Sequence, residues 1–195
     1  MGNYSTTVDY EQQKHLLDTC AKGDQRSHKK FYDMFAPVMY GICLRYADSN
    51  EEAKDWLQEG FIKAFANLTV FRNEGSLEGW LKRIFVNHAL EQVRHKKILF
   101  KTVPIDIGIE NAEQAPYNFN FDSKMDQKQI LALINTLPIG CRTVFNLFII
   151  EGYSHQEIAT MLEVTEGTSK SQLARARQLM QQKLTNKVIA NNEQF

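Results

Sequence analysis

The sequence predicts an all-α protein made of two helical domains joined by a linker. Apolar residues recur at steps of three and four along most of the chain, which is the period of amphipathic helices. This period is lost over residues 100–123, which contain Pro104, Gly108 and Pro116. Such a long stretch without a period is uncommon inside a compact domain, so we expect a flexible, acidic linker there. The predicted divisions are 10–99, 100–123 and 124–190.

The first domain is predicted to be a bundle of four amphipathic helices. The first is a short helix that ends before Gly23, and the second is a long helix over 31–46 that contains Pro37. The third covers 51–68 and is capped by Asn50, and the fourth begins at Ser76. The segment from Phe71 to Gly75 is expected to form a loop between the last two helices.

The second domain is predicted to end in a helix-turn-helix between Gly152 and Leu184. It should begin with one helix over 125–137 and, after a break at Leu137–Pro138, a second helix over 139–152. Ser154 and Glu157 then have the spacing of a capping box, which starts a short helix. Residues 163–165 form the turn, and Thr165 is able to cap the final helix.

The final helix has the composition of a helix that enters the DNA major groove. From Lys170 to Lys187 there are five basic residues and no acidic one. Groove recognition needs small or hydrogen-bonding side chains near the helix start with cations beside them. The alternative is a solvated basic helix within a bundle, and we favour DNA binding.

Charge is unevenly distributed along a chain whose net charge is zero. Lys82 to Lys101 carries six basic residues against Glu91 alone, whereas Asp48 to Glu59 and Asp106 to Asp126 are acidic. Local fields rather than the total charge steer a polyanion. Two basic regions therefore indicate two DNA contacts, and the acidic stretches indicate a protein partner.

Five motifs in order resemble those of a bacterial protein family. Residues 53–61, AKDWLQEGF, are similar to A-x-D-L-V-Q-E-x-F, and Phe71–Arg72 followed by residues 80–87 is similar to F-R…W-L-x-R-I-x-x-N. Leu137–Pro138, residues 152–159 and residues 167–171 are similar to L-P, G-x-S-x-x-E-I-A and G-T-V-K-S. Together they resemble the extracytoplasmic-function sigma factors of bacterial RNA polymerase. Trp56, Ser169 and Gln172 depart from the family's common leucine, valine and arginine.

The resemblance implies that the first domain is sigma region 2 and the second is sigma region 4. A protein of this kind binds core RNA polymerase and directs promoter-specific transcription initiation by reading −35 and −10 elements. The implied partners are the β′ clamp helices and the β subunit of core RNA polymerase, promoter DNA and an anti-sigma factor.

The resemblance and the residue chemistry together assign three groups of residues. The core-binding group, in which Trp56 and Phe61 are also expected to pack inside the bundle, is Asp55, Trp56, Gln58, Glu59 and Phe61. The −10 group, which offers aromatic faces for unpaired bases beside cations, is Phe71, Arg72, Asn73, Trp80, Lys82, Arg83, Asn87 and Arg94. The −35 group is Thr168, Ser169, Lys170, Ser171, Gln172, Ala174, Arg175 and Arg177. For Trp80 a core position is slightly favoured over base stacking.

The pattern gives no support for catalysis, a metal or a cofactor. The five histidines are scattered, and the three cysteines are widely spaced without a C-x-x-C, as in a reducing cytosol. Neither a signal peptide nor a membrane span is found, so we expect a cytoplasmic protein. The second candidate function is a free-standing helix-turn-helix transcriptional regulator. A purely protein-binding helical adaptor does not explain two basic regions.

Overall fold

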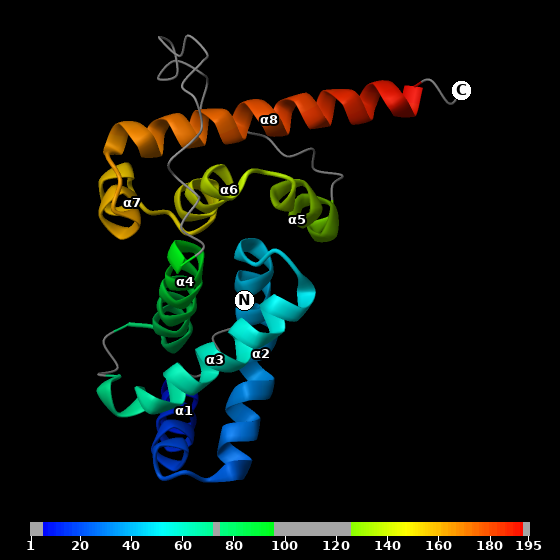
Figure 1. The fold of residues 1–195 in the computed structure, drawn as a ribbon. Helices are drawn as coiled ribbons and strands as arrows, with labels where there is room; N and C mark the ends of the chain where they lie inside the picture. Colours follow the sequence, from blue (N-terminus) through cyan, green and yellow to red (C-terminus); the bar gives the residue numbers. More distant parts are fainter. Residues whose placement is uncertain (1–5, 72–74, 96–125, 193–195) are drawn as a thin grey trace. The chain divides into compact units, whose positions relative to one another are not determined.

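The computed structural model describes residues 6–71, 75–95 and 126–192, and every regular element in these ranges is a helix (Figure 1). The all-α prediction is therefore confirmed for this part of the chain. The chain divides into two units, Met1–Ala89 and Leu90–Phe195, with the division inside the fourth helix. The predicted linker over 100–123 lies outside the described residues.

The first unit is built from α1 (Thr6–Ala21), α2 (Gln25–Tyr46), α3 (Asn50–Ala66), a short 3-10 turn, η1 (Leu68–Val70), and the start of α4 (Leu77–His95). Asp24 caps α2 by accepting a hydrogen bond from the Ser27 amide at 2.8 Å, and hydrogen bonding from the Ser27 side chain, with that amide bond, lowers the pKa of the Asp24 carboxyl. α2 continues through Pro37. The predicted cap of α3 is wrong by one position, because Ser49 rather than Asn50 accepts from the Glu52 amide.

Aromatic rings form the centre of the first unit. Phe31 of α2, Phe61 of α3 and Phe85 of α4 are all buried, and the Phe61 and Phe85 rings meet edge to face with centroids 5.2 Å apart. Gly60 allows this approach, since a Cβ there would lie 2.3 Å from Phe85 Cε1. The packing fixes α4 against α3 and so sets which faces of these two helices remain on the surface.

The second unit contains α5 (Gln127–Asn135), α6 (Ile139–Phe145), a π-helical turn, η2 (Asn146–Ile150), α7 (His155–Leu162) and α8 (Glu166–Asn192). Asp126 and Gln129 form a capping box at the start of α5. The expected single helix over 139–152 is instead α6 followed by the π turn, and Gly152, with φ of +81°, ends it in a left-handed conformation. Figure 1 shows α8 as the long C-terminal helix, and α5, α6 and α7 all contact it.

Candidate nucleic-acid and partner interfaces

The outer face of α3 carries the polar residues of the predicted core-binding group. Asp55, Gln58 and Glu59 are exposed, whereas only 4 % of Trp56 and 3 % of Phe61 is accessible. Trp56 and Phe61 are thus bundle residues, as their periodicity indicated, and their assignment as direct partner contacts is wrong. The part of α3 that a partner can reach is an acidic and amide surface. We call it the α3 face: Asp55, Gln58 and Glu59.

Glu59 links the α3 face to α4. Its carboxylate Oε2 lies 3.0 Å from Nε2 of His88, whose side chain is buried, and the His88 ring lies edge-on to Trp56 with centroids 6.5 Å apart. The α3 residues Trp56 and Glu59 thus both contact a histidine adjacent in sequence to Asn87. Sequence reasoning missed this pair, because His88 is one of five scattered histidines and only the packing brings it to Glu59.

Two predicted aromatic residues meet at the N-terminal end of α4. Phe71 and Trp80 are both half-buried, and their ring centroids lie 5.2 Å apart with planes inclined by 46°. Trp80 thus packs on Phe71 and is also partly accessible, so both a core position and base stacking remain predictions for it. Arg72 and Asn73, which belong to the same predicted group, lie outside the described residues.

The polar members of the −10 group share one side of α4. Arg83, Asn87 and Arg94 are exposed and follow Trp80 at steps of three, four and seven, which place them along one helix face. We call this set the α4 stripe: Trp80, Arg83, Asn87 and Arg94. The exposed Glu91 lies on the same side of α4 and lowers the net positive charge of the stripe. Lys82 lies off the stripe and forms an ion pair with Glu78 at 2.7 Å.

Residues 163–165 form the predicted turn between α7 and α8. Ser154 and Glu157 make both bonds of the capping box, which confirms that prediction. Thr165 caps α8 by accepting from the Thr168 amide at 3.0 Å, as predicted. Between the helices, Glu163 has φ of +57° and ψ of +42°, a left-handed conformation that non-glycine residues rarely adopt.

The outward side of α8 presents hydroxyl, methyl and cationic groups in succession. Lys170 is exposed, and Thr168, Ser171, Ala174, Arg175 and Arg177 are half-buried. Arg175 donates to the Gln178 side-chain oxygen at 2.8 Å, a contact that the sequence did not indicate. The Ser171 hydroxyl donates to the Thr168 carbonyl, which leaves its oxygen as an acceptor. We call this set the α8 face: Thr168, Lys170, Ser171, Ala174, Arg175 and Arg177.

Two residues of the predicted −35 group point inward instead. Ser169 is fully inaccessible and Gln172 is 6 % accessible, so neither is placed to contact DNA directly. Ser169 Oγ lies 2.9 Å from Nδ1 of His155, and Gln172 accepts a hydrogen bond from the Cys141 thiol at 2.9 Å. Gln172, which the sequence placed in the −35 group, instead contributes its amide to the packing of α8 on α6.

His155 is the first residue of α7 and contacts Ser169 of α8, a role that its position among five scattered histidines does not indicate. Its ring stacks on Phe148, with centroids 4.4 Å apart and planes inclined by 23°. Burial first, and then the charges of Lys170 and Arg177, lower the pKa of His155, while Glu166 opposes them. Near neutral pH this histidine is therefore held largely in its neutral form.

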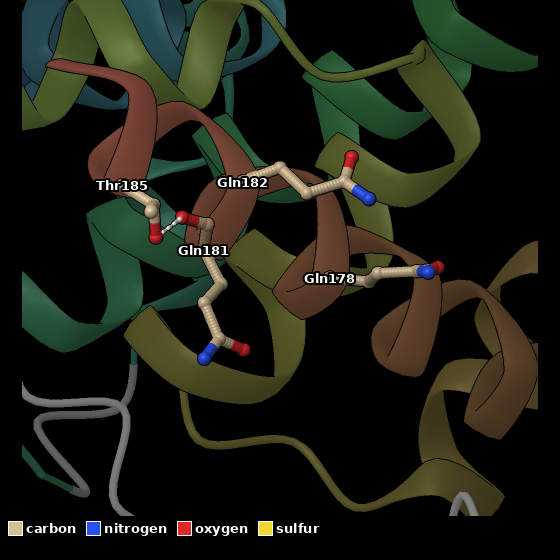
Figure 2. Close-up of a pocket in the computed structure, with 4 residues that line it drawn as sticks. All are labelled: Gln178, Gln181, Gln182 and Thr185. Atoms are coloured by element: carbon tan, nitrogen blue, oxygen red, sulfur yellow. Dashed lines mark hydrogen bonds between the residues drawn. The ribbon is translucent and has the colours of Figure 1, made fainter. Parts of the chain in front are cut away.

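An open hollow of about 520 Å³ lies along the C-terminal part of α8 (Figure 2). Its described lining consists of Gln178, Gln181, Gln182 and Thr185, and Thr185 donates to the Gln181 carbonyl at 3.0 Å. Ligand pockets are mostly apolar and enclosed, so this row of surface amides does not favour a ligand-sensing regulator. Within 6–71, 75–95 and 126–192 no cluster of three metal-binding side chains is present, and no helix is long and apolar enough to span a membrane.

Comparisons with known proteins agree with this arrangement. The family model for sigma-70 region 2 matches residues 31–98, and that for sigma-70 region 4 matches residues 127–180. The chain is 28 % identical to RNA polymerase sigma-H factor of Pseudomonas aeruginosa, over 89 % of this chain and 94 % of that protein. It is also 28 % identical to the ECF RNA polymerase sigma factor SigW of Bacillus subtilis, over 88 % of this chain and 96 % of that protein.

Among solved structures, the sigma factor RpoE in complex with the anti-sigma factor NepR from Bartonella quintana overlaps 80 % of this chain and 96 % of its own. The identity is 22 % and the TM-score 0.49. The two family models together span more than half of the chain and match its two units in order. The chain therefore belongs to the sigma-70 family of RNA polymerase sigma factors, within the extracytoplasmic-function group.

Proposed function

We propose that the α8 face reads the −35 element of promoters, the α4 stripe with Phe71 holds unpaired −10 bases, and the α3 face docks on the β′ clamp helices of core RNA polymerase. The observation that carries the proposal is the side-chain order on α8. Short hydrogen-bonding groups, Thr168 and Ser171, stand near the helix start, with Lys170 and Arg175 beside them. This is the combination that reads base edges while contacting phosphates.

The −10 role rests on the Phe71–Trp80 pair and the polar groups that follow it on α4. Two adjacent half-buried rings offer an aromatic surface on which a base that has left the duplex can stack. Arg83 and Arg94 supply positive charge for the backbone, and the exposed amide of Asn87 is able to hydrogen-bond a base edge. Lys82 remains a candidate for backbone contact, in competition with its bond to Glu78.

The docking role rests on the exposed polarity of the α3 face. An acidic and amide surface suits a basic partner, since charges at the rim of an interface set orientation and association rate. Besides the clamp helices, the proposed partners are the β subunit and an anti-sigma factor. An anti-sigma factor would act by covering one or more of the three surfaces.

The test of the overall role is run-off transcription on the promoter upstream of the protein's own gene. Initiation should require both this protein and core RNA polymerase, and the start site should shift when the −10 and −35 elements are moved together. If the protein alone bound that DNA specifically and core added nothing, it would act as a free-standing regulator.

The docking surface is tested with Asp55→Arg, which reverses an exposed charge on the α3 face. We expect weaker competition for core RNA polymerase at an unchanged melting temperature, because surface substitutions alter stability by about 0.5 kcal/mol or less. Lys54→Glu is the matched control, an exposed charge reversal at the neighbouring position. Glu59→Arg is less informative, because it also removes the contact with His88. Equal loss in the Asp55 and Lys54 variants would argue against this docking face.

A further inference from the structure

The buried side of α8 contains two polar side chains at its N-terminal end. Ser169 and Gln172 are three residues apart, so they share one helix face, which Leu173, Ala176 and Met180 continue as an apolar stripe. Each polar group has a partner on a different element. Ser169 pairs with His155 of α7, and Gln172 with Cys141 of α6, both at 2.9 Å.

Both partners are themselves held in place. The His155 ring stacks on Phe148 of η2 on one side and meets Ser169 through Nδ1. Cys141 is fully buried, and burial raises the pKa of its thiol to about 11, so the S–H group that donates to Gln172 persists at neutral pH. The start of α8 is thereby tied to two fixed points on the rest of the helix-turn-helix unit.

Apolar packing alone defines the rotation of a helix loosely, whereas hydrogen bonds are directional. A helix with its side chains is about 10–12 Å across, so a rotation of about 20° moves a side-chain tip by roughly 2 Å. That displacement breaks a hydrogen bond, whose donor and acceptor must stay within about 3.2 Å. The same rotation would carry Lys170 and Ser171, which lie between Ser169 and Gln172 in the sequence, away from any base they contact.

We propose that His155 and Cys141 are positioning residues for promoter recognition, which fix the rotation of α8 through their bonds to Ser169 and Gln172. The inference rests on the proposed −35 role of the α8 face and adds two residues that touch no DNA themselves. Loss of either bond should leave the affinity for phosphates intact and lower the preference for the correct base sequence.

The experiment uses holoenzyme reconstituted from core RNA polymerase and the full chain. Wild-type holoenzyme first selects a −35 sequence from a randomised promoter library. Promoter binding is then measured on the selected sequence and on a scrambled one, and the ratio of the two affinities is the readout. Variants that remove a bond are Ser169→Ala, Cys141→Ala and His155→Phe. The matched control variants, which keep a hydrogen-bonding group at the same place, are Ser169→Thr, Cys141→Ser and His155→Asn.

We expect the removing variants to lower the affinity ratio about 3- to 10-fold, the range that one hydrogen bond supports, and the retaining variants to stay within about twofold of wild type. Binding to the scrambled promoter should hardly change. If the ratio instead followed the melting temperature of each variant, the two residues would be merely structural and the inference would be overturned. If wild-type holoenzyme selected a −35 sequence and every variant kept the wild-type affinity ratio, the inference would be overturned while the proposed function would stand. A wild-type holoenzyme without a −35 preference would overturn the proposed function as well.

Discussion

The charged side chains of α8 act on His155 as well as on whatever the helix binds. Because burial, and then the charges of Lys170 and Arg177, oppose a positive charge on the imidazole, the pKa of His155 lies below its ordinary value of 6.5. The unfolded chain therefore binds this proton at a higher pH than the folded chain does. It follows that His155 lowers folding stability as the pH falls below 6.5, and that the loss levels off once the pH is below the folded-state pKa.

We predict that Lys170→Gln raises the pKa of His155, because it removes one of the two cations that depress it. The pKa is measured from the chemical shift of the imidazole Cε1 proton as a function of pH. Lys183→Gln, which removes a cation further along the same helix, serves as the control and should leave the curve in place. An identical titration in the Lys170 variant and the wild type would contradict the assigned cause.

Arg175 and Arg177 should differ in how they contribute to DNA recognition. If the Arg175 guanidinium contacts guanine, Arg175→Ala costs about 1–3 kcal/mol on the preferred −35 sequence and relaxes the preference at one base pair. Arg177→Ala should weaken all −35 variants alike and reduce the salt slope by about one unit. Binding of holoenzyme to a randomised −35 library measures both effects. An unchanged sequence preference for Arg175→Ala would remove Arg175 from the base-reading residues.

At the interfaces, the sequence predicted the residue types and the helices that carry them better than it predicted which way each side chain points. Arg83, Asn87 and Lys170 are exposed as expected. Ser169 and Gln172 were assigned to DNA because small and amide side chains near the start of a recognition helix are typical of base contacts. Their burial depends on α6 and α7 packing on that side of α8, which local spacing does not reveal. For the same reason, the sequence pattern indicates neither the role of His155 nor the contact between Glu59 and His88.

At the scale of the elements, local hydrogen bonding was the best guide to helix ends. Ser154 with Glu157 and Thr165 were predicted correctly, because a cap needs only residues within one turn. The cap of α3 was predicted at Asn50 but lies at Ser49, since both residue types cap helices well and the local geometry decides between neighbouring positions. The π turn after α6 was missed, since an apolar run gives no sign of one extra residue in a helical turn.

The turn between α7 and α8 holds a strained residue whose replacement should stabilise the second unit. Glu163 has a left-handed backbone, which costs an L-residue roughly 1 kcal/mol or more and glycine almost nothing. We predict that Glu163→Gly gains about 0.5–1 kcal/mol in the free energy of unfolding, measured by denaturant titration. Glu163→Ala keeps the strain and removes the carboxylate, so it should give no gain. Equal stabilisation by both changes would mean that the carboxylate, rather than the backbone, is unfavourable.

At the scale of the whole molecule, the proposed contacts are divided between the two units. The α3 face and most of the α4 stripe belong to residues 1–89, and the α8 face belongs to residues 90–195. Under the proposed assignment, each unit alone would bind only part of a promoter complex. Reading −10 and −35 elements together therefore requires that both units act on one polymerase, and the covalent connection makes their binding mutually dependent.

This dependence predicts the effect of cutting the chain within residues 100–123. If residues 100–123 form the linker that the sequence predicts, the intact chain holds the second unit at an effective concentration on the order of 1 mM, whereas separate fragments at micromolar concentration have no such advantage. A protease site inserted between residues 110 and 111 should leave transcription from a −35-dependent promoter nearly unchanged before cleavage and reduce it at least about 10-fold afterwards. On a promoter with a scrambled −35 element, cleavage should make little difference, because the second unit contributes little base-specific binding there. Full activity of the cleaved protein on the −35-dependent promoter would show that the two units act independently once bound.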